Sequence, residues 1–153
     1  MPKIELPLDL CNMIADYLPK YILHDWVDIN KLNWDMLSGN VNAIELLKEN
    51  YNKINWYWLS GNPAAMQILK ENLDKINWSM LSGNANAIEL LKENPDRIKW
   101  SMLSSNPAVI ELLKENQDKI EWHYLSRNTT AIPLLKENPD KISRNRATKR
   151  KPR

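Results

Sequence analysis

Five tryptophans recur at a constant spacing along the chain, and this regularity constrains the fold more than any other feature of the sequence. They are 22 residues apart each time, at Trp34, Trp56, Trp78, Trp100 and Trp122. After each Trp, a Leu follows at the third position, a Ser at the fourth and an Asn at the sixth. Such a period predicts stacked copies of one supersecondary unit.

The second half of each unit predicts an amphipathic helix. In residues 87–94 it reads A-I-E-L-L-K-E-N, with the apolar residues on one face and Glu and Lys on the other. Asn106 before Pro107 is typical of a helix start, because the Asn side chain caps free N–H groups and proline has no N–H to leave unpaired. Asn94 before Pro95 predicts the helix end.

The first half of each unit predicts a shorter helix, placed over residues 96–104 in one copy. Ile98 and Met102 lie opposite Trp100 and Leu103 on that helix, as expected for a helix packed between two neighbours. Helices this short are marginal alone, so stacking must stabilise them. The predicted fold is all-α, a right-handed α-solenoid of short helical hairpins with about five copies of the 22-residue unit.

A leucine-rich repeat of similar length is the main structural alternative. That pattern needs an L-x-L strand ahead of its Asn, whereas the matching segment here reads W-x-x-L-S-x-N. A proline at the start of the A-I-x-L-L segment also favours a helix, since proline suits a first helical turn.

The last unit carries a proline inside its second predicted helix. Pro133 stands where the other units have Glu or Gln, and a helix that began at Asn128 would be broken there. We therefore expect this unit to be remodelled, with its helix starting at Thr130 so that Pro133 falls in the first turn.

The charge distribution divides the chain into a body and a tail. The predicted segments are an N-terminal helix in residues 1–27, tandem repeats in 28–143 and a basic, disordered tail in 144–153. Without the tail, 15 basic side chains face 19 acidic ones, a net charge of −4. A nucleic acid, an import receptor or no partner at all would suit the tail. Its six basic residues are Arg144, Arg146, Lys149, Arg150, Lys151 and Arg153.

Composition favours a cytoplasmic or nuclear protein that is neither secreted nor bound to a membrane. Cys11 is the single cysteine, so no intramolecular disulfide can form. The N-terminus lacks the layout of a signal peptide, and no apolar run approaches the roughly 18 residues that a transmembrane helix needs.

Catalysis has little support in the sequence. His24, His123 and Cys11 show neither metal-ligand nor triad-like spacing, and no glycine-rich phosphate loop is present. We expect no enzyme activity and no cofactor, and interpret the protein as an interaction or scaffolding module.

Candidate binding residues are those that differ between units, because residues needed for stacking must repeat. An alternative is neutral drift, with Trp58, Met80, Met102 and Tyr124 filling the core. The repeated Trp itself is interpreted as core, with a stacking platform for a ligand as the alternative. The variable positions beside each Trp are Tyr57, Trp58, Ser79, Met80, Lys99, Ser101, Met102, Glu121, His123, Tyr124 and Arg127.

The unit K-I-N-W-x-x-L-S-G-N-x-x-A-I-x-L-L-K-E-N-P-D, over roughly residues 28–142, resembles short tandem repeats in proteins of the large nucleocytoplasmic DNA viruses. The resemblance implies a viral interaction protein that acts in the cytoplasm or nucleus of a host cell. A structural role in the virion, as a minor capsid component, is the alternative that it leaves open.

The N-terminal segment contains Leu6-Pro7-Leu8-Asp9-Leu10, then Ile14 and Tyr17-Leu18-Pro19. This pattern resembles the first helix of an F-box, the motif that docks substrate adaptors onto a cullin ubiquitin ligase. Residues 20–34 do not continue the F-box pattern. The resemblance implies a Skp1-like partner, with the repeats holding the substrate. The alternative is that residues 5–18 form a helix that caps the first repeat. The residues that would dock the adaptor are Leu6, Pro7, Leu10, Ile14 and Leu18.

Overall fold

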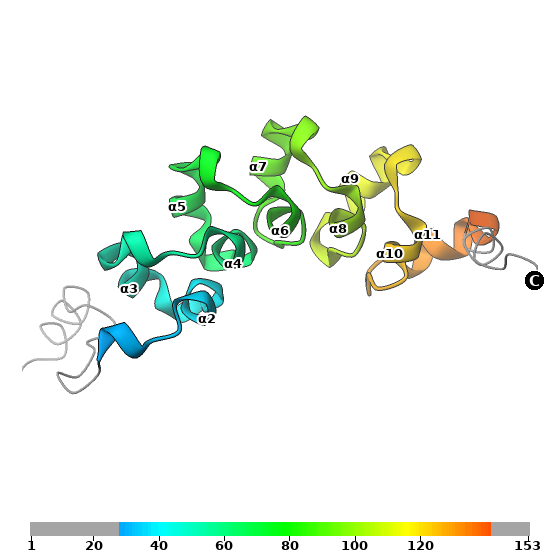
Figure 1. The fold of residues 1–153 in the computed structure, drawn as a ribbon. Helices are drawn as coiled ribbons and strands as arrows, with labels where there is room; N and C mark the ends of the chain where they lie inside the picture. Colours follow the sequence, from blue (N-terminus) through cyan, green and yellow to red (C-terminus); the bar gives the residue numbers. More distant parts are fainter. Residues whose placement is uncertain (1–27, 142–153) are drawn as a thin grey trace, which may run out of the picture.

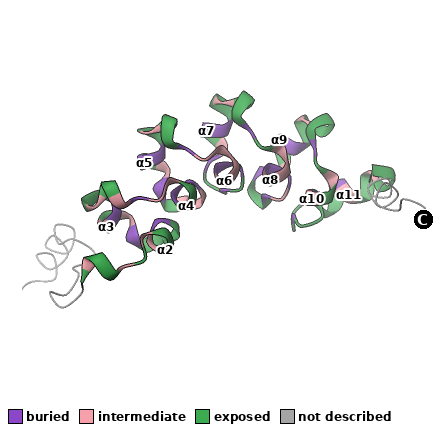
Figure 2. Ribbon diagram, in the orientation of Figure 1, coloured by how far each residue is buried: buried purple, intermediate pink, exposed green. Residues whose placement is uncertain are grey.

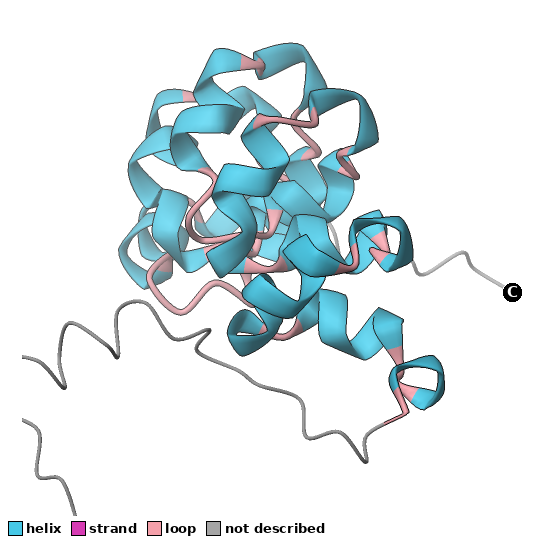
Figure 3. Cartoon of the chain, turned by 90° about the vertical axis from the view of Figure 1, so that its left-hand side faces the viewer, coloured by secondary structure: helices cyan, strands magenta, loops and turns pink. Residues whose placement is uncertain are grey.

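A computed structural model of the chain describes residues 28–141, and within this range it contains helices and no strands (Figures 1 and 3). The strand that a leucine-rich repeat would need is therefore absent from the described part. The α-helices are α2 (Trp34–Gly39), α3 (Ile44–Glu49), α4 (Trp56–Gly61), α5 (Met66–Lys70), α6 (Trp78–Ser82), α7 (Ile88–Glu93), α8 (Trp100–Ser104), α9 (Ile110–Glu115), α10 (Trp122–Leu125) and α11 (Ile132–Glu137).

Short 3-10 helices connect these α-helices. They are η1 (Ile29–Lys31), η2 (Val41–Ala43), η3 (Tyr51–Lys53), η4 (Pro63–Ala65), η5 (Leu73–Lys75), η6 (Pro95–Arg97), η7 (Pro107–Val109) and η8 (Gln117–Lys119). No helix of the described residues is long and apolar enough to cross a membrane.

Neighbouring helices pack in series along a curved row. Helices α2, α4, α6, α8 and α10 follow the inner side of the curve and contact one another in that order, while α3, α5, α7 and α9 follow the outer side (Figure 1). Buried residues lie mainly between the two rows (Figure 2). The fully buried leucines of the described residues are Leu47, Leu59, Leu69, Leu81, Leu90, Leu91, Leu103, Leu113, Leu125 and Leu134.

The single helix predicted over residues 96–104 is wrong, because the structure divides this segment. A 3-10 helix ends at Arg97, Ile98 is extended, and α8 begins at Trp100. The extended backbone lets the Lys99 N–H donate to Ser82 Oγ at 3.0 Å. Ser82 belongs to the preceding layer, where a layer is one inner helix together with the outer helix that follows it. A continuous helix would direct that N–H into its own ladder, so the break gives each layer a hydrogen bond to its neighbour.

The second predicted helix also has two parts, a 3-10 or turn segment and then an α-helix. The Asn side chain caps the first part, as Asn106 Oδ1 does by accepting from the Ala108 N–H at 3.0 Å. The α-helical part begins four residues after that Asn in every layer, at Ile44, Met66, Ile88, Ile110 and Ile132.

This shared start removes the need to remodel the last layer. Helix α11 begins at Ile132, which is the position used in the other layers and lies two residues after the predicted Thr130. Pro133 is its second residue, so the prediction that it lies in the first turn is confirmed. An N–H at this position has no acceptor within the helix, and proline loses nothing there.

A buried asparagine joins each layer to the one before it. Asn84 Nδ2 donates to the carbonyls of Ser60 and Asn62, both at 3.1 Å, while its Oδ1 accepts from the Asn86 N–H at 3.0 Å. Asn84 is 2% exposed. One side chain therefore caps its own layer and bonds to the previous one. The same two-carbonyl contact is made by Asn62, Asn106 and Asn128.

The repeated serine completes this junction. Ser60 Oγ donates to the Trp56 carbonyl at 2.7 Å and accepts from the Asn77 N–H of the next layer at 2.9 Å. Both partners are backbone groups, so the hydroxyl satisfies a carbonyl and an N–H inside the molecule. Ser38, Ser82 and Ser104 make the equivalent pair of bonds.

The repeated tryptophans are half-buried and pack against the core on one side. A cation from the following connection lies over each ring, as Lys119 Nζ does at 5.1 Å from the centroid of Trp100. The ring thus separates the leucine core from a charged group. The other pairs are Lys53 with Trp34, Lys75 with Trp56, Arg97 with Trp78 and Lys141 with Trp122.

Replacement of one of these cations tests the contribution of the contact. We expect Lys119→Ala to lower the free energy of unfolding by about 0.5–1 kcal/mol, the usual range for an exposed cation–π pair. Urea denaturation followed by circular dichroism would measure it. Lys70→Ala on α5, where no ring contact is formed, is the control. Equal losses in both variants would show that the contact with Trp100 adds no stability.

Candidate binding face on the inner helices

A row of large apolar side chains follows the inner helices, one from each helix. They stand two residues after each repeated Trp, and we call them the inner row: Met36, Trp58, Met80, Met102 and Tyr124. Met36 is 71% exposed and Trp58 is 44% exposed, while the other three are half-buried. The alternative that Trp58, Met80, Met102 and Tyr124 simply fill the core does not hold for Trp58, and Met36 is still more exposed.

Three of the predicted binding residues extend the row, one beside Trp58 and two at the far end. Tyr57 is 48% exposed and meets the Trp58 ring edge-to-face, with 5.2 Å between centroids. At the far end His123 meets the Tyr124 ring at 5.6 Å, and the Arg127 guanidinium lies over the same ring at 5.9 Å. Exposed aromatic and Arg side chains are frequent anchors in protein interfaces.

Lys99 and Glu121 have a structural task that sequence reasoning missed. They occupy the N-cap positions of α8 and α10, and their N–H groups donate to Ser82 Oγ and Ser104 Oγ at 3.0 and 3.1 Å. Both side chains are exposed and make no capping hydrogen bond. Their backbones thus serve the layer junction, while their side chains remain available to a partner.

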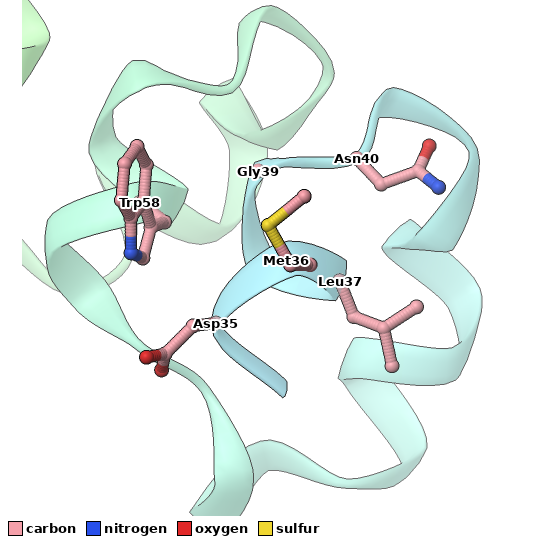
Figure 4. A pocket seen from close by; sticks show the side chains of 6 residues that line it. All are labelled: Asp35, Met36, Leu37, Gly39, Asn40 and Trp58. Atoms are coloured by element: carbon pink, nitrogen blue, oxygen red, sulfur yellow. The ribbon is translucent and has the colours of Figure 1, made fainter. Parts of the chain in front are cut away.

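A groove lies on this face between α2 and α4. Its volume is about 460 Å³, and Figure 4 shows Trp58 of α4 beside Met36 of α2, with Asp35 below them. Asp35 accepts a hydrogen bond from Asn55 Nδ2 at 2.7 Å and forms no ion pair among the described residues. The lining residues are Asp35, Met36, Leu37, Gly39, Asn40 and Trp58.

Met36 and Gly39 were absent from the residues predicted by variation between units. The glycine offered a signal, because the three glycines of the chain all stand five residues after a repeated Trp, at Gly39, Gly61 and Gly83. None has a positive φ, so backbone conformation does not require them. A Cβ on Gly61 would lie 3.0 Å from Met80 Cε, whereas one on Gly39 would make an ordinary contact with Trp58 Cβ at 3.9 Å.

Other predicted sites lie outside the described residues. These are the adaptor-docking residues between Leu6 and Leu18 and the basic tail from Arg144 to Arg153. Within residues 28–141, no group of three or more His, Cys, Asp or Glu side chains is placed to hold a metal ion. On the outer helix α9, a hydrogen bond to the Glu111 carboxylate raises the pKa of Lys114.

Comparison with known proteins finds no match: no family model, curated protein or solved structure is similar to the chain.

Proposed function

We propose that this protein is a non-catalytic binding module, an open-ended α-solenoid of 22-residue units whose inner row holds a partner protein. The observation that supports this most is the exposure of Met36, Tyr57 and Trp58 beside one groove. Leaving such side chains in water forgoes about 1.5–3 kcal/mol each relative to burial, and a partner that covers them recovers that free energy.

The layered construction suits this role. Each junction is held by buried hydrogen bonds of a Ser and an Asn and by a Leu that no solvent reaches, so the residue two places after the Trp is free to differ. The row accordingly contains Met, Trp, Met, Met and Tyr on a constant frame. Variable anchors on repeated helices are the usual binding surface of repeat proteins.

Affinity capture with the full chain tests the proposal. Trp58→Ala should abolish recovery of any partner that wild-type protein recovers from cell lysate and mass spectrometry identifies. Leu73→Ala is the matched control, because Leu73 is also a large exposed apolar residue but lies on η5, outside the inner row. A partner lost equally with both variants, or with neither, would place its binding site elsewhere on the molecule.

A further inference from the structure

We propose that the groove between α2 and α4 binds an extended, proline-containing segment of the partner in the polyproline II conformation, with a Lys or Arg of that segment beside Asp35. This rests on the proposed function and names the ligand chemistry of the groove on the inner row. The occupant follows from the charge of the lining, the hydrogen-bonding state of Trp58 and the shape of the groove floor.

The charge of the lining selects a basic ligand. Asp35 is the charged residue among the six that line the groove, and no Lys or Arg of residues 28–141 forms an ion pair with it. A cationic side chain that lies along Met36 can place its stem on apolar surface and its charge beside the carboxylate. The same cation is attracted by the face of Trp58.

The indole of Trp58 selects a ligand whose carbonyls are free. Its ring is 44% exposed, and Nε1 has no hydrogen-bond acceptor among the described residues. A polyproline II segment makes no internal hydrogen bonds, so its carbonyls can accept from the indole N–H. The carbonyls of an α-helix are already paired within the helix. Aromatic grooves are the usual receptors of proline-rich segments for this reason.

The spacing of the row also suits this conformation. Packed helices lie about 8–10 Å apart, and a polyproline II helix repeats every three residues over roughly 9.3 Å. A β-strand presents the same side every two residues, over about 6.8 Å, and would lose register from one helix to the next. One residue in three of the ligand can thus meet Met36 and then Trp58.

Gly39 allows the ligand backbone to approach the floor of the groove. A Cβ at this position would make an ordinary contact with Trp58 Cβ at 3.9 Å, so internal packing leaves room for alanine. Glycine near the end of a helix instead of alanine costs about 0.5–1 kcal/mol of stability. Gly83 has equally ordinary contacts outside the groove, so exchange of the two glycines for alanine tests whether the ligand uses the space above Gly39.

The test uses the full chain and the synthetic peptide Pro-Leu-Pro-Pro-Lys-Pro with blocked ends. NMR shift changes and tryptophan fluorescence would report binding at residues 35–40 and 58. We expect Trp58→Ala to weaken binding about 30-fold and Asp35→Asn to weaken it about threefold, an effect that salt removes. Gly39→Ala should weaken binding about tenfold while the midpoint of urea denaturation stays constant or rises.

Two matched controls complete the design. Gly83→Ala makes the same change outside the groove, where the new methyl group has ordinary contacts, and should leave binding unaltered. The peptide with Glu in place of Lys should bind more weakly. Equal binding of the Glu peptide, tighter binding of a basic amphipathic helical peptide, no binding of the Lys peptide, or insensitivity to Trp58→Ala would each overturn the inference. If the peptide gives one of these contrary results but a captured partner is still lost with Trp58→Ala, the proposed function stands while this inference fails.

Discussion

Replacing Asn84 by alanine is expected to lower the free energy of unfolding by about 3–5 kcal/mol, because three hydrogen bonds disappear and the two carbonyl partners stay buried. Asn84 donates to the Ser60 and Asn62 carbonyls and accepts from the Asn86 N–H. The Asn62 carbonyl still accepts from the Ala65 N–H, so the loss of hydrogen bonding is expected to be greatest at the Ser60 carbonyl. Urea denaturation followed by circular dichroism would measure the loss.

Two further variants separate the junction from the cap. Asn84→Asp keeps the oxygen that caps Asn86 but sets a carboxylate against two carbonyls, so we expect at least as large a loss as with alanine. Asn40→Ala removes the equivalent cap in the first described layer, where Asn40 is exposed and its Nδ2 has no acceptor among the described residues. We expect Asn40→Ala to lower the free energy of unfolding by about 1 kcal/mol. A similar loss for Asn84→Ala and Asn40→Ala would mean that the hydrogen bonds between layers add no stability beyond that of the capping hydrogen bond.

The second large effect is expected for Leu81→Ala, which should lower the free energy of unfolding by about 3–5 kcal/mol. Leu81 lies on α6 in the middle of the row and is 0% exposed, so the truncation leaves a cavity between α6 and its neighbours. In a protein of marginal total stability this loss leaves a substantial unfolded fraction. Thermal and urea denaturation of the same variant would both show it.

Leu37→Ala is the matched control for Leu81→Ala. Leu37 has the same place in α2 but is half-buried at the end of the described layers, so about 1–2 kcal/mol is expected. If both variants lost the same amount, burial within the row would not be the source of stability. A loss below 1 kcal/mol for Leu81→Ala would show that the inner helices do not carry the core.

Local signals in the sequence were sufficient to predict the second helix of a unit and its caps, although not its division into a 3-10 and an α-helical part. The A-I-E-L-L-K-E-N pattern predicted a helix ended by Asn94, and the structure ends α7 at Glu93 with Asn94 as its cap. The Asn before proline was correctly interpreted as a cap at Asn106. Such signals act within a few residues, where the identity of the side chain decides which backbone groups it can reach.

The sequence by itself thus determined the helical class and caps such as Asn94 and Asn106, because each depends on short-range chemistry or on apolar spacing. Tertiary structure alone decided the break at Ile98, the two-carbonyl bonds of Asn84 and the groove beside Trp58. In each case the partner lies in another layer, 17 to 24 residues away in the chain. Apolar spacing shows that Leu81 needs cover, but it does not show which neighbour provides it. Nor does it decide whether Trp58 of α4 fills the core or is open to solvent, as the structure has it.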